Sequence, residues 1–439
     1  MLETLKKALK VKEIRKRLLY TFLMLIVVRL GSQIPIPFVN GDAIKDIMSN
    51  FSNENFSFFT AITGGSMEKM SVFALSITPY ITSSIIMQLL TIAIPKLEEM
   101  QKEGEDGRKK IASITRYVTI GLSLIESIAM AVGFGRSGLI KDSAQLSTLH
   151  YVVCIIVVIA ALTAGSAVLM WLGERITEKG VGNGISIVLL INIISGMPSD
   201  FATLYSTFVA PKTPAKGVLA AVIILAILIV MVVLVCFLQD GERRIPVQYS
   251  QKVSGRRTVG GQSTNIPLKV NTAGVMPIIF ASSLMQFPVI IAQLFGKSYE
   301  WTRYLSSSYW CRVEAPKYSI GLLVYIVLLI IFAYFYTSIT FNPIEVADNL
   351  KKAGGVIPGI TPGKSTSEYL NKILNYIVFI GAVGLLIIAL IPIMCTGFFN
   401  ASVSFGGTSI IIIVGVVLET LKQIESQMCN RYYKGFLSE

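Results

Sequence analysis

Long apolar stretches recur along this chain, and they differ in how many polar side chains they carry. The stretch Val218–Leu238 has no strongly polar side chain, whereas Val72–Ile94 has hydroxyl and amide side chains around Pro79. About 20 apolar residues cross a bilayer as a helix. Polar groups are tolerated at that depth where neighbouring helices or a wet path satisfy them. The pattern predicts a membrane protein with a dedicated interior.

We expect nine or ten membrane-spanning helices, the fifth of which is short. Their ranges are 18–36, 71–93, 113–134, 151–172, 183–198, 217–238, 271–293, 318–340, 372–393 and 401–418. These ranges place the chain in the class of all-α membrane proteins.

Composition and charge agree with that class. The 439 residues are 53% hydrophobic and 15% charged, against about 25% charged in soluble proteins. With the N-terminus placed in the cytosol, the cytosolic loops and ends hold 28 of the 39 Lys and Arg residues, and the other side holds 10. This asymmetry follows the positive-inside rule with both termini cytosolic. Topology therefore explains most of the +13 net charge, and no sequence-specific nucleic-acid partner is expected.

The chain lacks the residue sets that enzymes and metal proteins use. It has one histidine, no CxxC motif, and no Ser/His/Asp set or carboxylate dyad within the spans. The run Gly359–Ser365 resembles a phosphate loop, but its glycines are one residue too close together. We therefore expect no catalytic activity, no metal and no cofactor.

Two segments near the N-terminus have two interpretations each. Residues 1–17 are basic with apolar residues at helical spacing, which is typical of an amphipathic helix on anionic lipids or of a solvated leader. The segment Phe56–Met70 is apolar, too short to cross, and divided by Gly64 and Gly65. It is either a re-entrant piece or an external turn.

Glu126 is the one acidic residue inside a predicted span. Burying such a group costs about 2.5–3.5 kcal/mol on insertion scales, so it normally has a partner and a role. Asn271, Thr272, Thr78 and Thr82 are candidate partners. The alternative is a protonated Glu126 that bonds a backbone carbonyl.

Two large cytosolic loops, 239–270 and 341–371, are expected to be docking surfaces rather than simple tethers. The first contains the runs VQYSQKV and TVGG, which predict a short hairpin.

Eight strings in unbroken order resemble the SecY family, the central subunits of the bacterial protein-conducting channel. They are RLGSQIPIP, FALSITPYITSSIIMQLL, KEGEDGRKKI, MWLGERITEKGVGNGISI, RRIPVQY, the stretch Ser254–Ser283, the stretch Phe341–Gly363 and FGGTSIIIIV. The likeness runs from about Arg15 to Gly435.

The resemblance implies two inverted five-helix halves, 18–198 and 217–418, around a central pore, followed by a cytosolic tail 419–439. It also implies a plug at residues 57–69, with Phe58, Phe59, Ile62, Gly64, Gly65 and Met67. Spans two, three, seven and eight would form a lateral gate, whose polar cluster would be Thr78, Thr82, Glu126 and Asn271. The family's pore ring corresponds to Ile77, Ile81, Ile185, Leu189, Ile279 and Ile412. A collar of aliphatic side chains keeps a narrow constriction dry, although any one of the six suits a core or a lipid-facing position equally well.

The resemblance further implies a set of partners. Arg243, Arg244, Arg256, Arg257, Lys351 and Lys352 correspond to docking sites for the ribosome and the motor ATPase SecA. Small SecE- and SecG-type membrane subunits, signal peptides and nascent chains complete the set. The chain departs from the family pattern at Thr361, where arginine is usual, and at Phe38, where glycine is usual.

The expected function is therefore passage of unfolded secretory proteins across the bacterial plasma membrane, with release of apolar segments into lipid. The alternative is an inverted-repeat secondary transporter that uses Glu126. A purely structural scaffold is disfavoured by the plug-like segment and by the polar second span.

Overall fold

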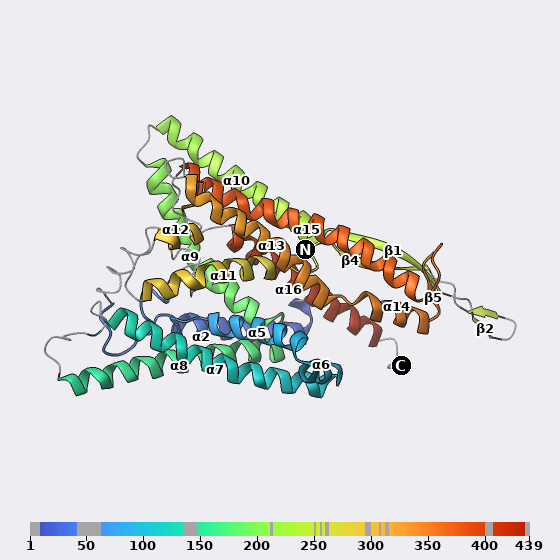
Figure 1. Cartoon of the computed structure of the whole chain (residues 1–439), viewed down its shortest axis with the longest axis horizontal. Helices are drawn as coiled ribbons and strands as arrows, with labels where there is room; N and C mark the ends of the chain where they lie inside the picture. Colours follow the sequence, from blue (N-terminus) through green and yellow to red (C-terminus); the bar gives the residue numbers. More distant parts are fainter. Residues whose placement is uncertain are drawn as a thin grey trace.

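The computed structural model describes residues 9–41, 63–135, 140, 147–210, 214–249, 252–254, 257–259, 263–294, 300–306, 309–311, 316–399 and 407–434. Long helices dominate these residues (Figure 1). They are α2 (Lys12–Gly31), α5 (Thr78–Ala93), α7 (Glu105–Gly135), α8 (Thr148–Lys179), α9 (Gly184–Leu204), α10 (Pro214–Asp240), α11 (Met276–Leu294), α13 (Ile320–Thr340), α15 (Lys364–Phe399) and α16 (Gly407–Lys434).

Each predicted span overlaps one of these helices, in the same order along the chain. Within the described residues, six helices are long and apolar enough to cross a membrane by themselves, and α5 with its continuation α6 (Pro95–Lys102) makes a seventh, bent by 100°. The chain is thus a multi-pass, mainly helical membrane protein, as the apolar pattern predicted.

The contrast between the first two stretches we compared is also visible in the packing. Large apolar side chains of α10, including Val222, Leu225 and Phe237, remain exposed on the surface that lipid would cover. In α5, by contrast, Ser83 is fully buried, and its hydroxyl lies 2.5 Å from the Thr119 hydroxyl of α7. Part of the polar content of the second span therefore joins two helices.

The prediction of a helix across 71–93 was wrong at its beginning. Helix α5 starts only at Thr78, and Pro79 occupies its first turn rather than its middle. Proline is suited to that position because the first amide groups of a helix have no partner within the helix. The preceding residues form tight turns, and Ser76 adopts a φ of 53°.

This irregular lead-in is protected by protein. Its backbone pairs with the segment that follows α2. The Val72 amide donates to Ile34 O, and the Ile36 amide donates to Met70 O, both at 3.0 Å. Met70, Ala74 and Leu75 are buried. Irregular backbone is tolerated at membrane depth only under such cover. The 16 residues of α5 measure about 24 Å, which is shorter than the roughly 30 Å hydrocarbon core of a bilayer. The lead-in therefore supplies the rest of this crossing.

Helix α11 begins in the same way, so the prediction that Asn271 lies on a membrane helix was also wrong. Residues 271–275 are turns, Gly274 has a φ of 63°, and Pro277 is the second residue of the helix. The fifth span was predicted too short: α9 has 21 residues, contains Pro198, and continues into a π-helix, η1 (Tyr205–Val209).

The packing of the helices repeats itself. Helix α2 packs on α8 and α9, and α10 packs on α15 and α16. In the first half, α5 contacts α7, α7 contacts α8 and α8 contacts α9. In the second half, α11, α13, α15 and α16 contact one another in the same order. Because α10 is the fifth long helix after α2, and successive long helices alternate in direction, equivalent helices run in opposite directions. The two five-helix halves meet where α7 packs on α11 and where α9 packs on α16.

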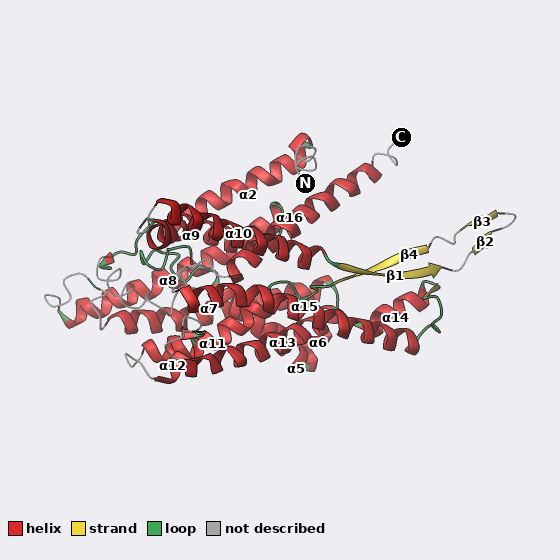
Figure 2. Ribbon diagram, turned by 90° about the horizontal axis from the view of Figure 1, so that it is seen from above, coloured by secondary structure: helices red, strands yellow, loops and turns green. Residues whose placement is uncertain are grey.

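A β-ribbon extends from one end of the helix bundle, which we call the ribbon end (Figures 1 and 2). Strand β1 (Glu242–Tyr249) pairs antiparallel with β4 (Ser263–Lys269), with Ile245 opposite Ile266. Strand β5 (Gly355–Val356), which follows α14 (Pro343–Lys352), pairs with the other edge of β1. At the tip, β2 (Lys252–Ser254) pairs with β3 (Arg257–Val259). The predicted hairpin is confirmed, and it is longer than we expected.

Figure 2 shows the beginning of α2 and the end of α16 at the same end of the bundle as the ribbon. There Ile14 of α2 is buried against Val181 and Ile424, with Val11 and Leu18 packed around them. In the described part of the N-terminal segment, these apolar side chains therefore contact protein.

The tight fit of the lead-in against α8 yields a stability prediction. A Cβ at Gly165 would collide with the carbonyl oxygen of Val72, whereas a Cβ at Gly121 of α7 would have nothing within 4 Å. We expect Gly165→Ala to destabilise the protein by about 1–3 kcal/mol, as overpacking does. Gly121→Ala should leave stability unchanged or slightly raised. Thermal unfolding in detergent measures both variants, and equal unfolding temperatures would contradict the described packing.

Candidate functional site

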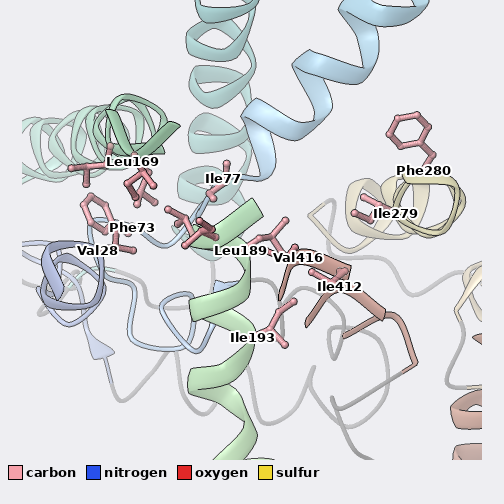
Figure 3. Close-up of a cluster of buried hydrophobic side chains, with 14 residues drawn as sticks. Val28, Phe73, Ile77, Leu169, Leu189, Ile193, Ile279, Phe280, Ile412 and Val416 are labelled. Carbon is pink, nitrogen blue, oxygen red and sulfur yellow. The ribbon is translucent and has the colours of Figure 1, made fainter. Parts of the chain in front are cut away.

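Aliphatic side chains from both halves meet in one buried cluster near the middle of the molecule. Ile77 precedes α5 directly, and Leu189, Ile279 and Ile412 come from α9, α11 and α16. Their exposed fractions are 2%, 5%, 6% and 3%. Ile81 and Ile185 pack against the same cluster and are partly buried. All six positions expected to form a pore ring therefore lie in one cluster. Figure 3 shows four of them, Ile77, Leu189, Ile279 and Ile412.

Local sequence explains why these side chains point to one place. The Asn183 side chain caps α9 by accepting a hydrogen bond from the Ile185 amide at 3.1 Å. With the helix start fixed, Ile185 and Leu189 are four residues apart and share one face. The tight turns before α5 bring Ile77 to the cluster without a preceding helical turn.

Among the members of this cluster that sequence reasoning missed, two lie directly beside the predicted ring. Ile193 and Val416 are buried beside the predicted residues, with 3% and 7% exposure (Figure 3). Each follows a predicted ring residue, Leu189 or Ile412, by four positions on the same helix. The i, i+4 spacing was a signal that would have found both.

The cluster also extends beyond the predicted ring. Val28, Phe73 and Leu169 belong to it, but they fill the space among α2, α8 and the lead-in to α5. Phe280 packs toward α13 instead, with its ring edge-on to Phe332 at 5.6 Å between centroids. These residues form the core of the first half or of the α11–α13 contact.

The described part of the predicted plug, residues 63–69, is mostly buried and consists mainly of turns. Gly64 and Gly65 have φ values of 60° and 77°, so the predicted break at this glycine pair is confirmed. Met67 is 6% exposed and packs in the core of the first half. Ser66 donates from its hydroxyl to Thr63 O at 2.6 Å. Phe58, Phe59 and Ile62 lie outside the described residues.

Within the described residues, the predicted polar cluster is not joined from one helix to another. The Thr82 hydroxyl donates to the Thr78 carbonyl within α5 at 3.0 Å. The Thr78 hydroxyl and the Asn271 side-chain nitrogen are buried without a hydrogen-bond partner. Glu126 lies on α7, which packs on α11. Within the described chain, no hydrogen bond or ion pair connects these side chains across the helices.

The predicted docking cations lie at the ribbon end. Arg243 and Arg244 are exposed on β1, and Arg244 pairs with Glu242 at 2.6 Å. Lys351 and Lys352 are exposed at the end of α14, directly before β5. Pairing of β1 with β5 joins the two predicted docking loops into one sheet. Arg257 lies on β3 at the tip of the ribbon, and Arg256 falls outside the described residues.

The ribbon has a core of its own. Ile245, Val247 and Leu268 are buried against Leu350 and Leu370 of the neighbouring helices. Thr361, the departure from the expected arginine, contributes a 2.9 Å hydroxyl contact to Ser365 at the start of α15. The loops thus present their charges on a packed support.

Comparison with known proteins agrees with this arrangement. The SecY family model matches residues 71–421. The chain belongs to the SecY family. SecY-family relatives named "Protein translocase subunit SecY" include those of Streptomyces galbus and Halalkalibacterium halodurans, each 42% identical over the whole of both chains. The relative from Bacillus subtilis is 40% identical, again over both full lengths.

Solved structures show the same fold. One described as "The structure of a protein conducting channel" has a TM-score of 0.65 at 17% identity, and covers 95% of this chain and 94% of the other. "Sec61 in the Canine ribosome-channel complex from the endoplasmic reticulum" has a TM-score of 0.62 at 18% identity, with the same coverage. At these identities the likeness concerns the fold.

Proposed function

We propose that this SecY-family chain is the channel-forming subunit of a bacterial protein translocase. It would pass unfolded secretory proteins across the plasma membrane and release apolar segments into lipid. The observation that carries the proposal is the aliphatic cluster built by α9, α11, α16 and the lead-in to α5. The family relatives, which are named translocase subunits, support it.

The chemistry of the cluster suits a gate. Fully burying an aliphatic side chain is worth about 1.5–3 kcal/mol. Exposing Ile77, Leu189, Ile279 and Ile412 to water would therefore cost on the order of 6–12 kcal/mol. An idle constriction of this kind stays closed and dry. A passing polypeptide replaces the lost contacts with its own side chains, and no aliphatic group holds it by hydrogen bonds.

The division into halves suits a lateral exit. The ring residues come from both halves, so separation of the halves opens the constriction. The contact between α7 and α11 would be the moving side, with α5 and α13 beside it. The opposite side, where α9 packs on α16 and continues through η1 into α10, would act as the hinge.

A plug at 57–69 fits the same scheme. One solved structure of the same fold is of a SecY protein whose plug domain is described as stabilising the closed state of its channel. Here Gly64, Gly65 and Met67 would belong to the plug. The ribbon end would face the cytosol, where Arg243, Arg244, Lys351 and Lys352 would bind ribosomal RNA or the motor ATPase SecA. SecE- and SecG-type subunits would complete the assembly. One fold relative is a ribosome–channel complex, which supports the ribosome as a partner.

A stalled secretory chain with a photo-crosslinker in its mid-region distinguishes this proposal from a transporter. We expect labelling at Ile81 and Ile279, and none at Val230, a lipid-facing residue of α10 that is 53% exposed. Proton-coupled solute uptake that is lost in Glu126→Gln, without such labelling, would favour the transporter instead.

A second prediction concerns the dryness of the ring. We expect Ile412→Asn to raise ion leakage through idle channels in vesicles and to permit export of signal-defective substrates, because an amide wets the constriction. Ile412→Val should behave like the parent protein. Ile411→Asn is the matched control: Ile411 is fully buried, but it belongs to the core of the second half. It should lower thermal stability without a selective leak. Equal leakage from Ile411→Asn and Ile412→Asn would count against a ring at Ile412.

A third prediction concerns docking. Reversing Arg243 and Arg244 to Glu should weaken binding of ribosomes or of the motor ATPase roughly thirtyfold, since two exposed charges that each contribute on the order of 1 kcal/mol amount to about 2 kcal/mol. The remaining affinity should also depend less on salt. Lys216→Glu, an exposed charge at the start of α10, is the control and should leave binding unchanged. Unaltered affinity in the double variant would exclude these arginines from the docking surface.

A further inference from the structure

Asn192 is a buried amide directly beside the apolar ring, and the proposed channel function gives it no role. It lies on α9 three residues after Leu189 and is 2% exposed. Its Nδ2 donates a hydrogen bond of 3.0 Å to the Ser76 hydroxyl. Ser76 immediately precedes Ile77, so this bond fixes one ring position, Ile77, next to another, Leu189.

The bond also spans a point of backbone strain. Ser76 is 1% exposed, and its backbone has a φ of 53°, a value that residues other than glycine rarely adopt. Its amide donates to Phe73 O at 2.9 Å, which closes the turn before α5. The Asn192 amide therefore holds the strained residue from which α5 departs.

The same part of α9 carries the predicted plug. The backbone of Gly64 comes so close that a Cβ there would lie 2.6 Å from Asn192 O and 2.9 Å from Asn192 Cα. The Ser195 hydroxyl is within hydrogen-bonding distance of Gly64 O, at 3.3 Å, and of Asn192 O, at 3.1 Å. Only glycine fits at position 64 in this arrangement.

From these contacts we propose that Asn192 is a positioning residue that couples the plug to the ring. Its side chain holds Ile77 through Ser76, and its backbone, with Ser195, seats Gly64. Both ends of this bond lie in the first half, so the proposal requires that opening also shifts the lead-in of α5 relative to α9. That shift breaks the bond to Ser76 and disturbs the seat of Gly64 in the same step. This inference rests on the proposed channel function and adds a specific link between its two closing elements.

The remaining polar atom of Asn192 explains how such a link releases. Its Oδ1 is buried with no hydrogen-bond partner among the described residues. A buried acceptor without a partner disfavours the state that buries it. Opening exposes this oxygen to water. The free energy gained by hydrating it offsets part of the free energy lost when the hydrogen bond to Ser76 breaks. The link holds the closed state weakly enough to be broken in each cycle.

The test compares ion leakage through idle channels, measured with the full chain and its small membrane partners in vesicles. We expect Asn192→Ala to raise leakage about fivefold, the shift that loss of one buried hydrogen bond produces in a two-state equilibrium. Ser76→Gly removes the acceptor and keeps the backbone relaxed, since glycine tolerates a φ of 53°. It should match Asn192→Ala, and the double variant should leak no more than either single variant.

Glycine variants test the seat of the plug separately. Gly64→Ala should leak more than Gly65→Ala, because both positions have positive φ but an added methyl meets α9 only at Gly64. Gly196→Ala, where a Cβ has nothing within 4 Å, should not leak. A purely structural role would lower thermal stability without this pattern of leakage.

Deletion of residues 57–62 provides the reference. Leakage from the deletion and from Asn192→Ala, with secretory export retained, supports the coupling. Leakage from the deletion but not from Asn192→Ala or Gly64→Ala overturns the coupling and leaves the plug in place. A deletion that does not leak refutes the plug, and the coupling with it.

Discussion

The rule that backbone polar groups must be satisfied inside the membrane governs this structure. Most of the described chain obeys it with helices, whose hydrogen bonds are internal. The exceptions are the lead-in to α5, where Met70 O and Ile34 O accept backbone amides, and the turns before α11. Because irregular backbone survives only under cover, both lie inside the protein. Ile77 is the last residue of the first lead-in, and Ile279 lies in the first turn of α11, so the proposed ring lies where these two helices begin.

The two lead-ins are equivalent in the two halves. Thr78-Pro79 opens α5 and Met276-Pro277 opens α11, and each pair follows shortly after a residue of positive φ, Ser76 or Gly274. In each case a proline at the second helical position fixes the start of the helix. An apolar interface, to which the first half contributes four of the expected ring positions and the second half two, has no directional bonds between those side chains to break. It separates at a cost set by buried area alone.

Apolar patterning predicted the order of the helices well, because an uninterrupted apolar segment such as that of α10 can satisfy its backbone groups in lipid only by forming a helix. It failed at helix ends, where turn chemistry competes with hydropathy: Pro79 was placed in mid-helix and Asn271 on a helix. The six ring positions came from likeness to a family, since Ile412 and its neighbour Ile411 are indistinguishable by composition although they face different clusters. Phe38 shows the same limit. Its φ of 69° explains why glycine suits that position, but nothing in the local sequence reveals it.

The polar groups around the ring raise the question of why they do not wet it. Asn192 is near enough to matter, yet its amide is occupied by Ser76 and its backbone is covered by Gly64. Ser83 and Thr119 satisfy each other between α5 and α7. The Asn192 Nδ2 group and the Ser83 and Thr119 hydroxyls are therefore held by hydrogen bonds away from the cluster, and the space between the expected ring residues is left to aliphatic groups. The ribbon is continuous with this region, because β4 ends at Lys269 and α11 begins at Met276, with six residues between them. The amide of Val270 donates to Gly241 O at 2.8 Å, so the base of the ribbon and the start of α11 are one packed unit. A partner that binds the exposed arginines of β1 therefore acts on the same piece of backbone that carries Ile279 to the ring.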